Sequence, residues 1–115
     1  MIGIDIINID KIARIIDKWG EKFLNRIFSQ KEIEYCENKK NSYQCYAVRF
    51  AVKEAFYKAY NHIYGWKAIE MSSCRKPGVN ILDERLKREI DNFKIKLSTS
   101  HIKNIGIAIV SLSKS

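Results

Sequence analysis

The alternation of apolar and polar residues at the amino terminus predicts a strand over residues 2–7, because isoleucines at every second position give it an apolar face. Asn8 or Asp10 can then cap a helix that runs to about residue 23, with Gly20 weakening its last turn. The buried stripe expected for this helix consists of Ile12, Ile15, Ile16, Trp19 and Phe23.

Hydrophobic periodicity further along the chain predicts three more helices and four more strands. Ser29 followed by Glu32 is typical of a capping box that opens a helix to about residue 37. The longest helix is expected over 42–62, after a polar loop at 37–41, and a charged helix over 83–91. The expected strands are 69–73, 79–82, 93–100 and 105–112, the last two paired across a turn at 102–104.

Helices and strands do not alternate regularly in this pattern, so the predicted fold class is α+β. The chain has 115 residues, which is a typical length for one domain. No linker, repeat or low-complexity run divides it. We therefore expect a single domain over residues 1–115 with an ordinary compact core.

Charge adds a constraint on partners. The formal net charge of +8 favours anionic partners such as a nucleotide, an acidic protein, nucleic acid or a membrane surface, although a solvated lysine-rich surface explains it equally well. A basic stripe recurs at three- and four-residue spacing on the first helix. The stripe is either a solvated face or a dock for an acidic helix or a phosphate backbone, and it consists of Lys11, Arg14, Lys18 and Lys22.

Cysteine spacing and apolar run length bear on the compartment. Cys36, Cys45 and Cys74 are odd in number, far apart and without a CxxC pair, so buried or incidental free thiols are favoured over a disulfide or a zinc site. The apolar amino terminus is far shorter than the ~20 residues of a membrane span and lacks the layout of a signal peptide. These features predict a cytoplasmic protein without membrane association.

Two acidic residues stand where apolar ones are expected. Asp5 shares a strand face with Gly3, whose missing side chain leaves space for a ligand or another backbone. Glu54 and Lys58 fall in the middle of a stripe of small and aromatic residues on a helix that is apolar nearly all round. Buried charge is costly unless paired or bound to a metal, which indicates a site. Alternatively, Asp5 caps the next helix, and Glu54–Lys58 is an ordinary ion pair worth ~0.2–0.5 kcal/mol.

Other candidate ligand contacts are cationic. Arg49 and Lys53 are like charges one helical turn apart, which repel each other unless an anion lies between them. His101 follows Ser98-Thr99-Ser100 at a strand end, where a side chain can reach a ligand. By itself, a histidine in this position is more often a satisfied structural residue.

Three motifs, in this order, resemble the holo-acyl-carrier-protein synthase family of 4′-phosphopantetheinyl transferases. They are Gly3-Ile4-Asp5, the Phe-Ala-Val-Lys-Glu-Ala-Phe-Tyr-Lys-Ala run over 50–59, and Ser98-Thr99-Ser100-His101. A Lys76-Pro77 pair also matches the family's turn before a short strand. Order, spacing and length agree over essentially the whole chain, and the Lys-Glu-Ala helix is the specific element.

The resemblance implies a compact α+β fold in which an antiparallel sheet packs with a long central helix. It also implies a homotrimer with active sites at subunit interfaces. The implied reaction transfers the 4′-phosphopantetheine group of coenzyme A to a serine of an acidic apo acyl carrier protein and releases 3′,5′-ADP, in fatty acid biosynthesis. Magnesium is the implied cofactor, and coenzyme A is the co-substrate.

The resemblance also assigns roles residue by residue. Asp5 and Glu54 correspond to the metal-binding carboxylates, and together with Lys58 to the catalytic set. The implied contacts of the coenzyme A phosphates are Arg49, Lys53, Lys58 and His101. The first helix corresponds to the element that meets the carrier protein. The implied docking residues are therefore Lys11, Arg14, Lys18 and Lys22.

Chemistry agrees with these roles, because magnesium prefers oxygen ligands and typically takes one or two carboxylates plus phosphate oxygens and water. In this hypothesis the ion bridges the pyrophosphate and Lys58 offsets charge that develops in the transition state. Glu54, or a metal-bound water that it orients, takes the proton of the carrier serine.

Three departures from the family pattern concern the surroundings of this site. Lys11 stands where the family usually has arginine, and the glycine-rich loop after the long helix retains only Gly65. Cys74-Arg75 precedes Lys76-Pro77 without the usual glycine. None of these changes touches the implied metal ligands.

Two rival functions remain at this stage. A non-catalytic nucleic-acid-binding domain would explain the charge, but it gives Asp5 and Glu54 no role and matches no nucleic-acid motif, so we expect no nucleic-acid partner. A carrier-binding scaffold without catalysis is disfavoured by the intact acidic and basic set.

Overall fold

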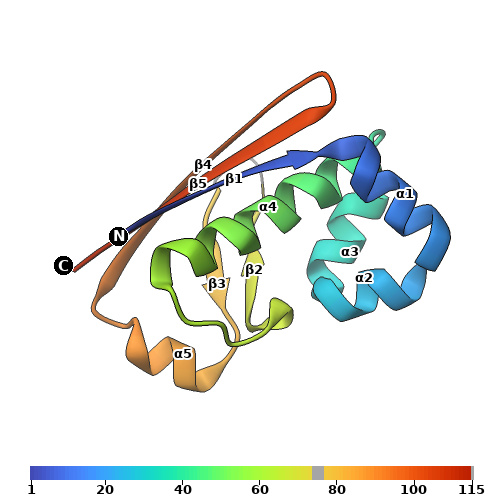
Figure 1. Ribbon diagram of the computed structural model, residues 1–115. Helices are drawn as coiled ribbons and strands as arrows, with labels where there is room; N and C mark the ends of the chain where they lie inside the picture. Colours follow the sequence, from blue (N-terminus) through green and yellow to red (C-terminus); the bar gives the residue numbers. More distant parts are fainter. Residues whose placement is uncertain (74–76, 115) are drawn as a thin grey trace.

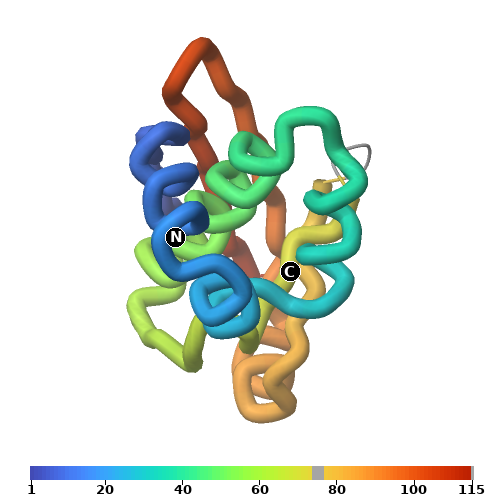
Figure 2. Tube along the Cα trace, turned by 90° about the vertical axis from the view of Figure 1, so that its right-hand side faces the viewer, coloured from blue at the N-terminus to red at the C-terminus, as the bar shows by residue number. Residues whose placement is uncertain are grey.

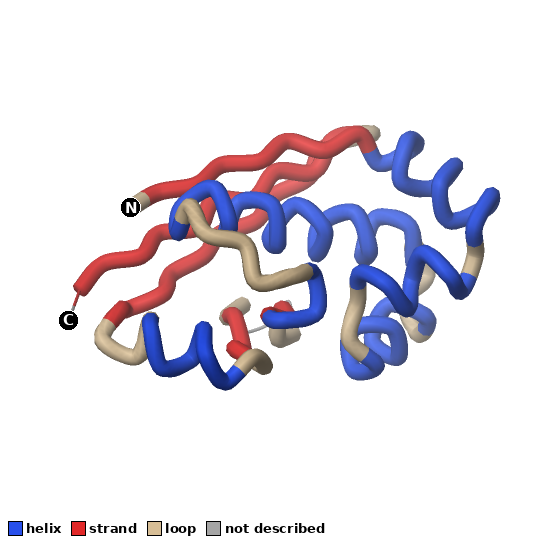
Figure 3. Tube along the Cα trace, turned by 60° about the horizontal axis from the view of Figure 1, so that its bottom comes forward, coloured by secondary structure: helices blue, strands red, loops and turns tan. Residues whose placement is uncertain are grey.

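A three-stranded antiparallel sheet and one long helix form the centre of the computed structural model, which describes residues 1–73 and 77–114 (Figure 1). The strand order is β1-β5-β4, and helix α4 crosses one face of the sheet. Figure 3 shows the three strands on one side of α4, the short strands and α5 on the other, and α1 beyond the end of the sheet. The structure thus confirms the α+β class and the central helix.

The elements follow one another along the chain in a mixed order. A two-stranded antiparallel sheet, β2-β3, lies beneath α4. The bounds are β1 Ile2–Asn8, α1 Ile9–Trp19, α2 Glu21–Ile27, α3 Gln30–Glu37, α4 Ser42–Tyr60, a 3₁₀ turn Trp66–Ala68, β2 Ile69–Met71, β3 Val79–Ile81, α5 Glu84–Glu89, β4 Phe93–Ile102 and β5 Ile105–Lys114. Helices α1, α2 and α3 gather at one end of the molecule (Figures 1 and 2).

Strand β1 and helix α4 approach each other closely at Gly3. A Cβ atom at this position would lie 1.9 Å from the carbonyl oxygen of Ala55 and 2.7 Å from the backbone nitrogen of Ala59. Only glycine allows this contact, so helix backbone rather than a ligand fills the space beside Gly3. The contact fixes α4 against the strand that carries Asp5.

The register of the sheet decides which side chains face α4. Asp5 pairs with Ala108, which pairs with Thr99, so the three side chains form one row on the inner face. The next inner row is Ile7, Gly106 and His101. The opposite, outer face carries alternate isoleucines of β1 and β5, several of which are exposed; these isoleucines are Ile2, Ile4, Ile6, Ile105, Ile107 and Ile109.

The first helix differs from its prediction at Gly20. Asn8 caps it as expected, its side chain accepting from the Lys11 backbone N–H, but the helix ends at Trp19. Gly20 adopts φ +56 and the chain restarts as α2 in a new direction. Trp19 is therefore 55% exposed, and its expected place in the buried stripe was wrong because the stripe assumed one continuous helix.

The other elements lie close to their predicted bounds. Ser29 and Glu32 form the expected capping box at the start of α3. Helix α4 ends at Tyr60, where Asn61 takes a left-handed conformation, and Gly65 comes later in the loop. The Lys76 half of the Lys76-Pro77 pair lies outside the described residues. No helix of the described residues is both long enough and apolar enough to cross a membrane.

The expectation of free thiols was wrong for two of the three cysteines. Cys36 at the end of α3 and Cys45 in the first turn of α4 form a disulfide, with Cα atoms 5.4 Å apart. The short connection between α3 and α4 brings the two helix ends together, which sequence spacing did not reveal. Cys74 lies outside the described residues.

Candidate active site

Asp5 and Lys58 form the contact that joins strand β1 to helix α4 at the candidate site. The Lys58 Nζ lies 3.0 Å from Asp5 Oδ1 and donates also to the Ile4 carbonyl oxygen at 3.1 Å. The Asp5 side chain is 13% exposed, whereas the Lys58 side chain is 54% exposed. A mostly shielded carboxylate is thus paired with a cation that solvent and ligands can reach.

Glu54 lies one helical turn before Lys58 and is half-buried. Burial raises the pKa of Glu54, and the negative charge of Asp5 raises this pKa further, while the positive charge of Lys58 opposes the shift. Asp5 contacts Lys58, and Glu54 lies on the same face of α4 as Lys58, so the two carboxylates flank one cation. The structure therefore brings together the three residues that the sequence singled out.

The donor set of this cluster fits a magnesium ion. Two carboxylates that repel each other are stabilised by a cation between them, and magnesium prefers hard oxygen ligands. Within residues 1–73 and 77–114, no group of three or more His, Cys, Asp or Glu side chains could hold a metal ion. Two carboxylates suit magnesium, which takes few protein ligands and completes its shell with phosphate oxygens and water.

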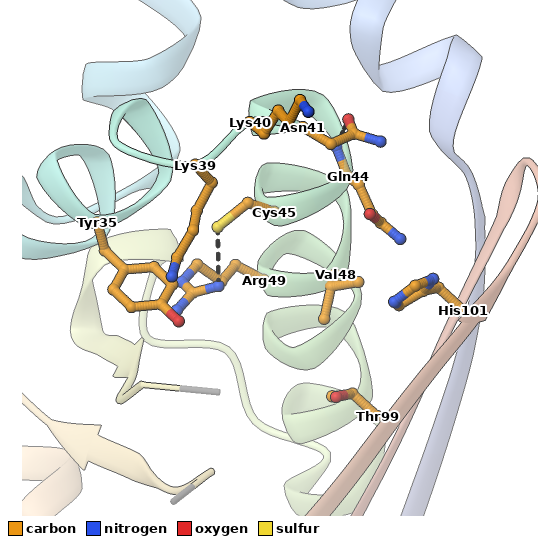
Figure 4. Close-up of a pocket in the computed structure, with 10 residues that line it drawn as sticks. All are labelled: Tyr35, Lys39, Lys40, Asn41, Gln44, Cys45, Val48, Arg49, Thr99 and His101. Carbon is orange, nitrogen blue, oxygen red and sulfur yellow. Dashed lines mark hydrogen bonds between the residues drawn. The ribbon is translucent and has the colours of Figure 1, made fainter. Parts of the chain in front are cut away.

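A cavity of about 340 Å³ lies between the start of α4 and the end of β4 (Figure 4). Its cationic groups indicate a site for an anion. Arg49 stacks on the ring of Tyr35 at 4.3 Å and donates to the Cys45 sulfur at 3.2 Å. The cavity is lined by Tyr35, Lys39, Lys40, Asn41, Gln44, Cys45, Val48, Arg49, Thr99 and His101.

Sequence reasoning found two members of this cavity, Arg49 and His101, and missed the lysines of the polar loop. Lys39 and Lys40 precede α4 and contribute two of the positive charges. Their available signal was the pair of adjacent lysines in the loop at 37–41. Thr99 was seen only as a residue of the strand, and the register shows that it faces the helix.

The cavity and the carboxylate cluster lie on opposite sides of α4. At ~100° per residue, Cys45 and Arg49 point about 180° and about 140° away from Glu54. The described lining of the cavity accordingly includes none of Asp5, Glu54 and Lys58. The cationic and the acidic candidate residues thus form two separate halves on one chain.

Lys53 lies in neither half. It is 1% exposed, and its ammonium group lies 2.9 Å from Glu32 Oε1 and donates to the carbonyl oxygens of Trp66 at 2.9 Å and Ile69 at 2.5 Å. These contacts occupy its three N–H donors. The anion expected beside Lys53 is therefore the carboxylate of Glu32, a residue of α3.

Glu32 connects this ion pair to a larger buried network. Its other carboxylate oxygen accepts from the Met71 backbone N–H at 3.0 Å, while Oε1 accepts from that of Ser29 at 3.0 Å. The Ser29 hydroxyl donates to Glu70 Oε2 at 2.5 Å. Burial lowers the pKa of Lys53, and the charge of Glu32 opposes this shift. The network ties α3, α4 and β2 together.

Comparison with known proteins places the whole arrangement in one family. The family model of the 4′-phosphopantetheinyl transferase superfamily matches residues 1–110. The chain belongs to this superfamily. The match includes all three motifs, and thus Asp5, Glu54, Lys58 and His101.

Members of the superfamily resemble the chain over nearly their full length. The holo-[acyl-carrier-protein] synthase of Halothermothrix orenii is 44% identical, over 95% of this chain and 93% of that protein. The crystal structure of the Neisseria meningitidis synthase matches with a TM-score of 0.87 at 28% identity, covering 98% and 97% of the two chains. The Helicobacter pylori synthase, solved in complex with coenzyme A, matches with a TM-score of 0.80 at 32% identity, covering 98% and 100%.

The basic stripe of this superfamily member is exposed along its whole length. Lys11, Arg14 and Lys18 lie on α1, and Lys22 follows the break at Gly20 on α2. Exposed Trp19 lies among them, with the Lys18 ammonium 5.3 Å from the ring centroid. The stripe therefore combines positive charge with an aromatic surface.

Proposed function

We propose that this chain is a holo-[acyl-carrier-protein] synthase, which transfers the 4′-phosphopantetheine group of coenzyme A to a serine of apo acyl carrier protein and releases 3′,5′-ADP. The observation that carries the proposal is the cluster of Asp5, Glu54 and Lys58 on the Gly-x-Asp strand and the Lys-Glu-Ala helix. Relatives of this name share 44% and 40% of their residues with the chain over more than nine-tenths of its length.

In the proposed reaction, the serine oxygen of the carrier attacks the β-phosphorus of coenzyme A. A bond forms between these atoms while the bond to the bridging oxygen of 3′,5′-ADP breaks. Asp5 and Glu54 would hold a magnesium ion, which supplies positive charge to the pyrophosphate when bound. The Lys58 ammonium, 54% exposed beside Asp5, offsets the negative charge that develops on the transferred group.

The serine hydroxyl needs a base, because it is a weak nucleophile while protonated. Glu54, or a water that it orients, accepts this proton. Its place beside Lys58 at the site favours the role, because a base must lie within hydrogen-bond reach of the proton that it takes. Asp5 contributes by holding Lys58 at 3.0 Å and by adding negative charge next to Glu54.

The cationic cavity is the proposed site of the coenzyme A phosphates. Arg49 and His101 line it, as do Lys39 and Lys40. Phosphate oxygens are well matched by guanidinium and ammonium donors. Lys53 would have to leave Glu32 and two carbonyl oxygens to reach a phosphate, so we assign it to supporting α4 from the core.

The exposed stripe of α1 and α2 is the proposed dock for the acidic carrier protein. Four cations, Lys11, Arg14, Lys18 and Lys22, are exposed on one stretch of chain next to the site-bearing strand β1. Complementary charge accelerates encounter and orients the partner.

Assembly into a homotrimer would complete the site. The outer face of the sheet exposes Ile2, Ile4 and Ile6 by 68, 50 and 66%, and Ile105 and Ile109 by 42 and 41%. A contiguous exposed apolar face of this kind marks a protein interface. Because the cavity and the carboxylates lie on opposite sides of α4, a site shared between neighbouring copies would bring the two halves to one coenzyme A molecule.

Mass spectrometry of the carrier protein tests the proposed function. We expect incubation with coenzyme A, Mg²⁺ and apo carrier protein to add one phosphopantetheine mass to the carrier. The variant Glu54→Gln should give no mass gain while its circular dichroism spectrum is unchanged. No gain with the wild-type chain, on a carrier that an active control enzyme modifies, would refute the function.

Magnesium dependence has its own test. Chelation with EDTA should abolish the mass gain, and excess Mg²⁺ should restore it. Full activity in EDTA would remove the metal from the proposal and leave the transfer itself in place.

A further inference from the structure

The disulfide between Cys36 and Cys45 closes a ring of chain at the mouth of the cationic cavity. Cys36 is fully buried at the end of α3, and Cys45 is half-buried in the first turn of α4. The ring between them contains the exposed loop that joins the two helices. The disulfide therefore anchors both ends of this loop.

Half of the described cavity lining comes from this ring. The ring residues that line the cavity are Lys39, Lys40, Asn41, Gln44 and Cys45. Figure 4 shows the Cys45 sulfur directed toward Arg49, and the Lys39 side chain extending toward Tyr35 and Arg49. One sulfur of the disulfide, that of Cys45, thus belongs to the wall of the cavity, and the other, that of Cys36, is bonded to it from the core.

The disulfide bears on two sources of positive charge in the cavity. It restricts the loop, and a restricted loop loses less conformational entropy when its lysines are held by an anion. It also fixes the Cys45 sulfur that accepts from Arg49 Nη1 at 3.2 Å. Arg49 donates in addition to the Ser72 carbonyl oxygen at 3.3 Å and stacks on Tyr35. The oxidation state of the two cysteines therefore bears on the position of the 37–41 loop and on the Cys45–Arg49 contact.

We propose that Cys36 and Cys45 are a redox switch of the anion cavity: the disulfide holds the 37–41 loop in its binding geometry, and reduction releases the loop and weakens coenzyme A binding. This inference rests on the proposed function, which makes the cavity the coenzyme A site. The co-reactant is a low-molecular-weight disulfide of the glutathione type. One protein thiolate attacks it, which releases one small thiolate and forms a mixed disulfide, and the second protein thiolate then attacks the protein sulfur of this mixed disulfide and releases the other small thiolate.

The exchange balances in atoms and electrons. Two cysteine thiols and one small disulfide give one protein disulfide and two small thiols. The two protein sulfurs are oxidised, the two sulfurs of the small disulfide are reduced, and the two cysteine protons end on the released thiols. Lasting disulfides are rare in reducing compartments, where those that form are usually catalytic or redox-sensing.

Calorimetric binding of coenzyme A to the full chain tests the switch. The chain is equilibrated either with excess glutathione disulfide or with dithiothreitol that is then removed, and the state of Cys36 and Cys45 is read by alkylation and peptide mass spectrometry. We expect the Kd for coenzyme A to be about tenfold higher in the reduced form. Cys36→Ser/Cys45→Ser should bind like the reduced form under both conditions.

Cys74→Ser is the matched control and should keep the full redox response of the wild type. Equal Kd values for verified oxidised and reduced chains would overturn the switch, as would failure of Cys36 and Cys45 to oxidise in excess glutathione disulfide. Loss of the response in Cys74→Ser would overturn it too, because it would assign the response to the wrong thiol.

Hydrogen exchange separates failure of the switch from failure of the proposed function. Amides of residues 37–44 should exchange at least about fivefold faster after reduction, in the absence of any ligand. Faster exchange without coenzyme A binding in either state would keep the redox-controlled loop and refute the proposed function. Unchanged exchange would overturn the switch whatever the transfer assay shows.

Discussion

At the scale of single residues, the site depends on Glu54, a carboxylate whose surroundings disfavour its ionised form. Glu54 is partly desolvated and lies near the negative charge of Asp5, which both raise its pKa, and the positive charge of Lys58 opposes these effects. The pKa of Glu54 in the magnesium-free protein should report this arrangement, because Asp5 and Lys58 shift it in opposite, known directions.

Substitution of Asp5 and substitution of Lys58 should move the pKa of Glu54 in opposite directions. Asp5→Asn removes a cause that raises this pKa and should lower it, so that Glu54 ionises at lower pH. Lys58→Met removes the cause that lowers it and should raise it, so that Glu54 stays protonated to higher pH. Carboxyl-carbon NMR titration of the metal-free protein measures both shifts.

Asp91→Asn, which removes a charge from an exposed site after α5, is the control and should leave the titration of Glu54 unchanged. If Asp5→Asn also left it unchanged, the two carboxylates would not share one site.

At the scale of elements, the buried network behind α4 holds the helix that carries the site. Lys53 and Glu32 are both shielded from solvent, at 1% and 0% side-chain exposure. Removing one partner of such a pair leaves a buried charge without compensation, which typically costs ~3–5 kcal/mol. The stability of the fold and the position of α4, which carries the site, thus both depend on this ion pair.

We expect Lys53→Met to destabilise the fold by ~3–5 kcal/mol in urea denaturation. Adding Glu32→Gln should recover part of this loss, because the amide carries no charge to compensate and its single oxygen still accepts from one of the two backbone N–H groups, of Ser29 and Met71, that bond to the two oxygens of Glu32. Lys31→Met on the exposed face of α3 is the control and should stay within about 0.5 kcal/mol of wild type.

Enzyme kinetics on the same variants separates the two roles of Lys53. A supporting role predicts that the folded double variant keeps a KM for coenzyme A close to that of wild type. A large rise in this KM, with wild-type stability, would instead place Lys53 on a phosphate.

The α1–α2 segment is the second element with a separable task. Arg14→Glu/Lys18→Glu reverses two charges of the exposed stripe and should raise the KM for carrier protein about tenfold, with little effect on the KM for coenzyme A. Lys87→Glu/Arg88→Glu on α5 is the charge-matched control. Equal effects of the α1 variant on both substrates would contradict a dock there.

At the scale of the whole molecule, the outer face of the sheet is an apolar surface that no other described element covers. The rows Ile4–Ile109–Ser98 and Ile6–Ile107–Ser100 run across it, apolar on β1 and β5 and polar on β4. The same sheet presents Asp5, Thr99 and His101 on its other face. Covering the outer face by neighbouring copies would place sites next to subunit boundaries.

Ile4→Lys should prevent assembly, because it puts a charge in the centre of the apolar face. We expect the wild type to sediment as three copies and Ile4→Lys as one copy with greatly reduced transfer activity. Ile63→Lys is the control, since Ile63 is 77% exposed in the loop after α4 and away from the sheet. A single-copy variant with full activity would show that one chain is sufficient.

Local sequence determined most of the elements and the identity of the chemistry. The capping signals at Asn8 and Ser29 placed helix starts correctly, since these caps act through side-chain hydrogen bonds within one turn. The Lys-Glu-Ala helix, with Asp5 on an alternating strand, pointed to the acidic cluster, because charged residues in apolar patterns are costly without a partner.

Only the tertiary structure decided which of the charged residues belong to the site. Lys53 and Arg49 look alike on the helix and both are 1% exposed, yet Lys53 pairs with Glu32, whereas Arg49, one turn nearer the start of α4, stacks on Tyr35 where it borders the cavity. The break at Gly20 exposed Trp19, and the short turn between α3 and α4 brought Cys36 to Cys45. The exposure of Trp19 and the Cys36–Cys45 contact both depend on the direction that the chain takes after a turn. Local hydrophobic periodicity does not encode this direction.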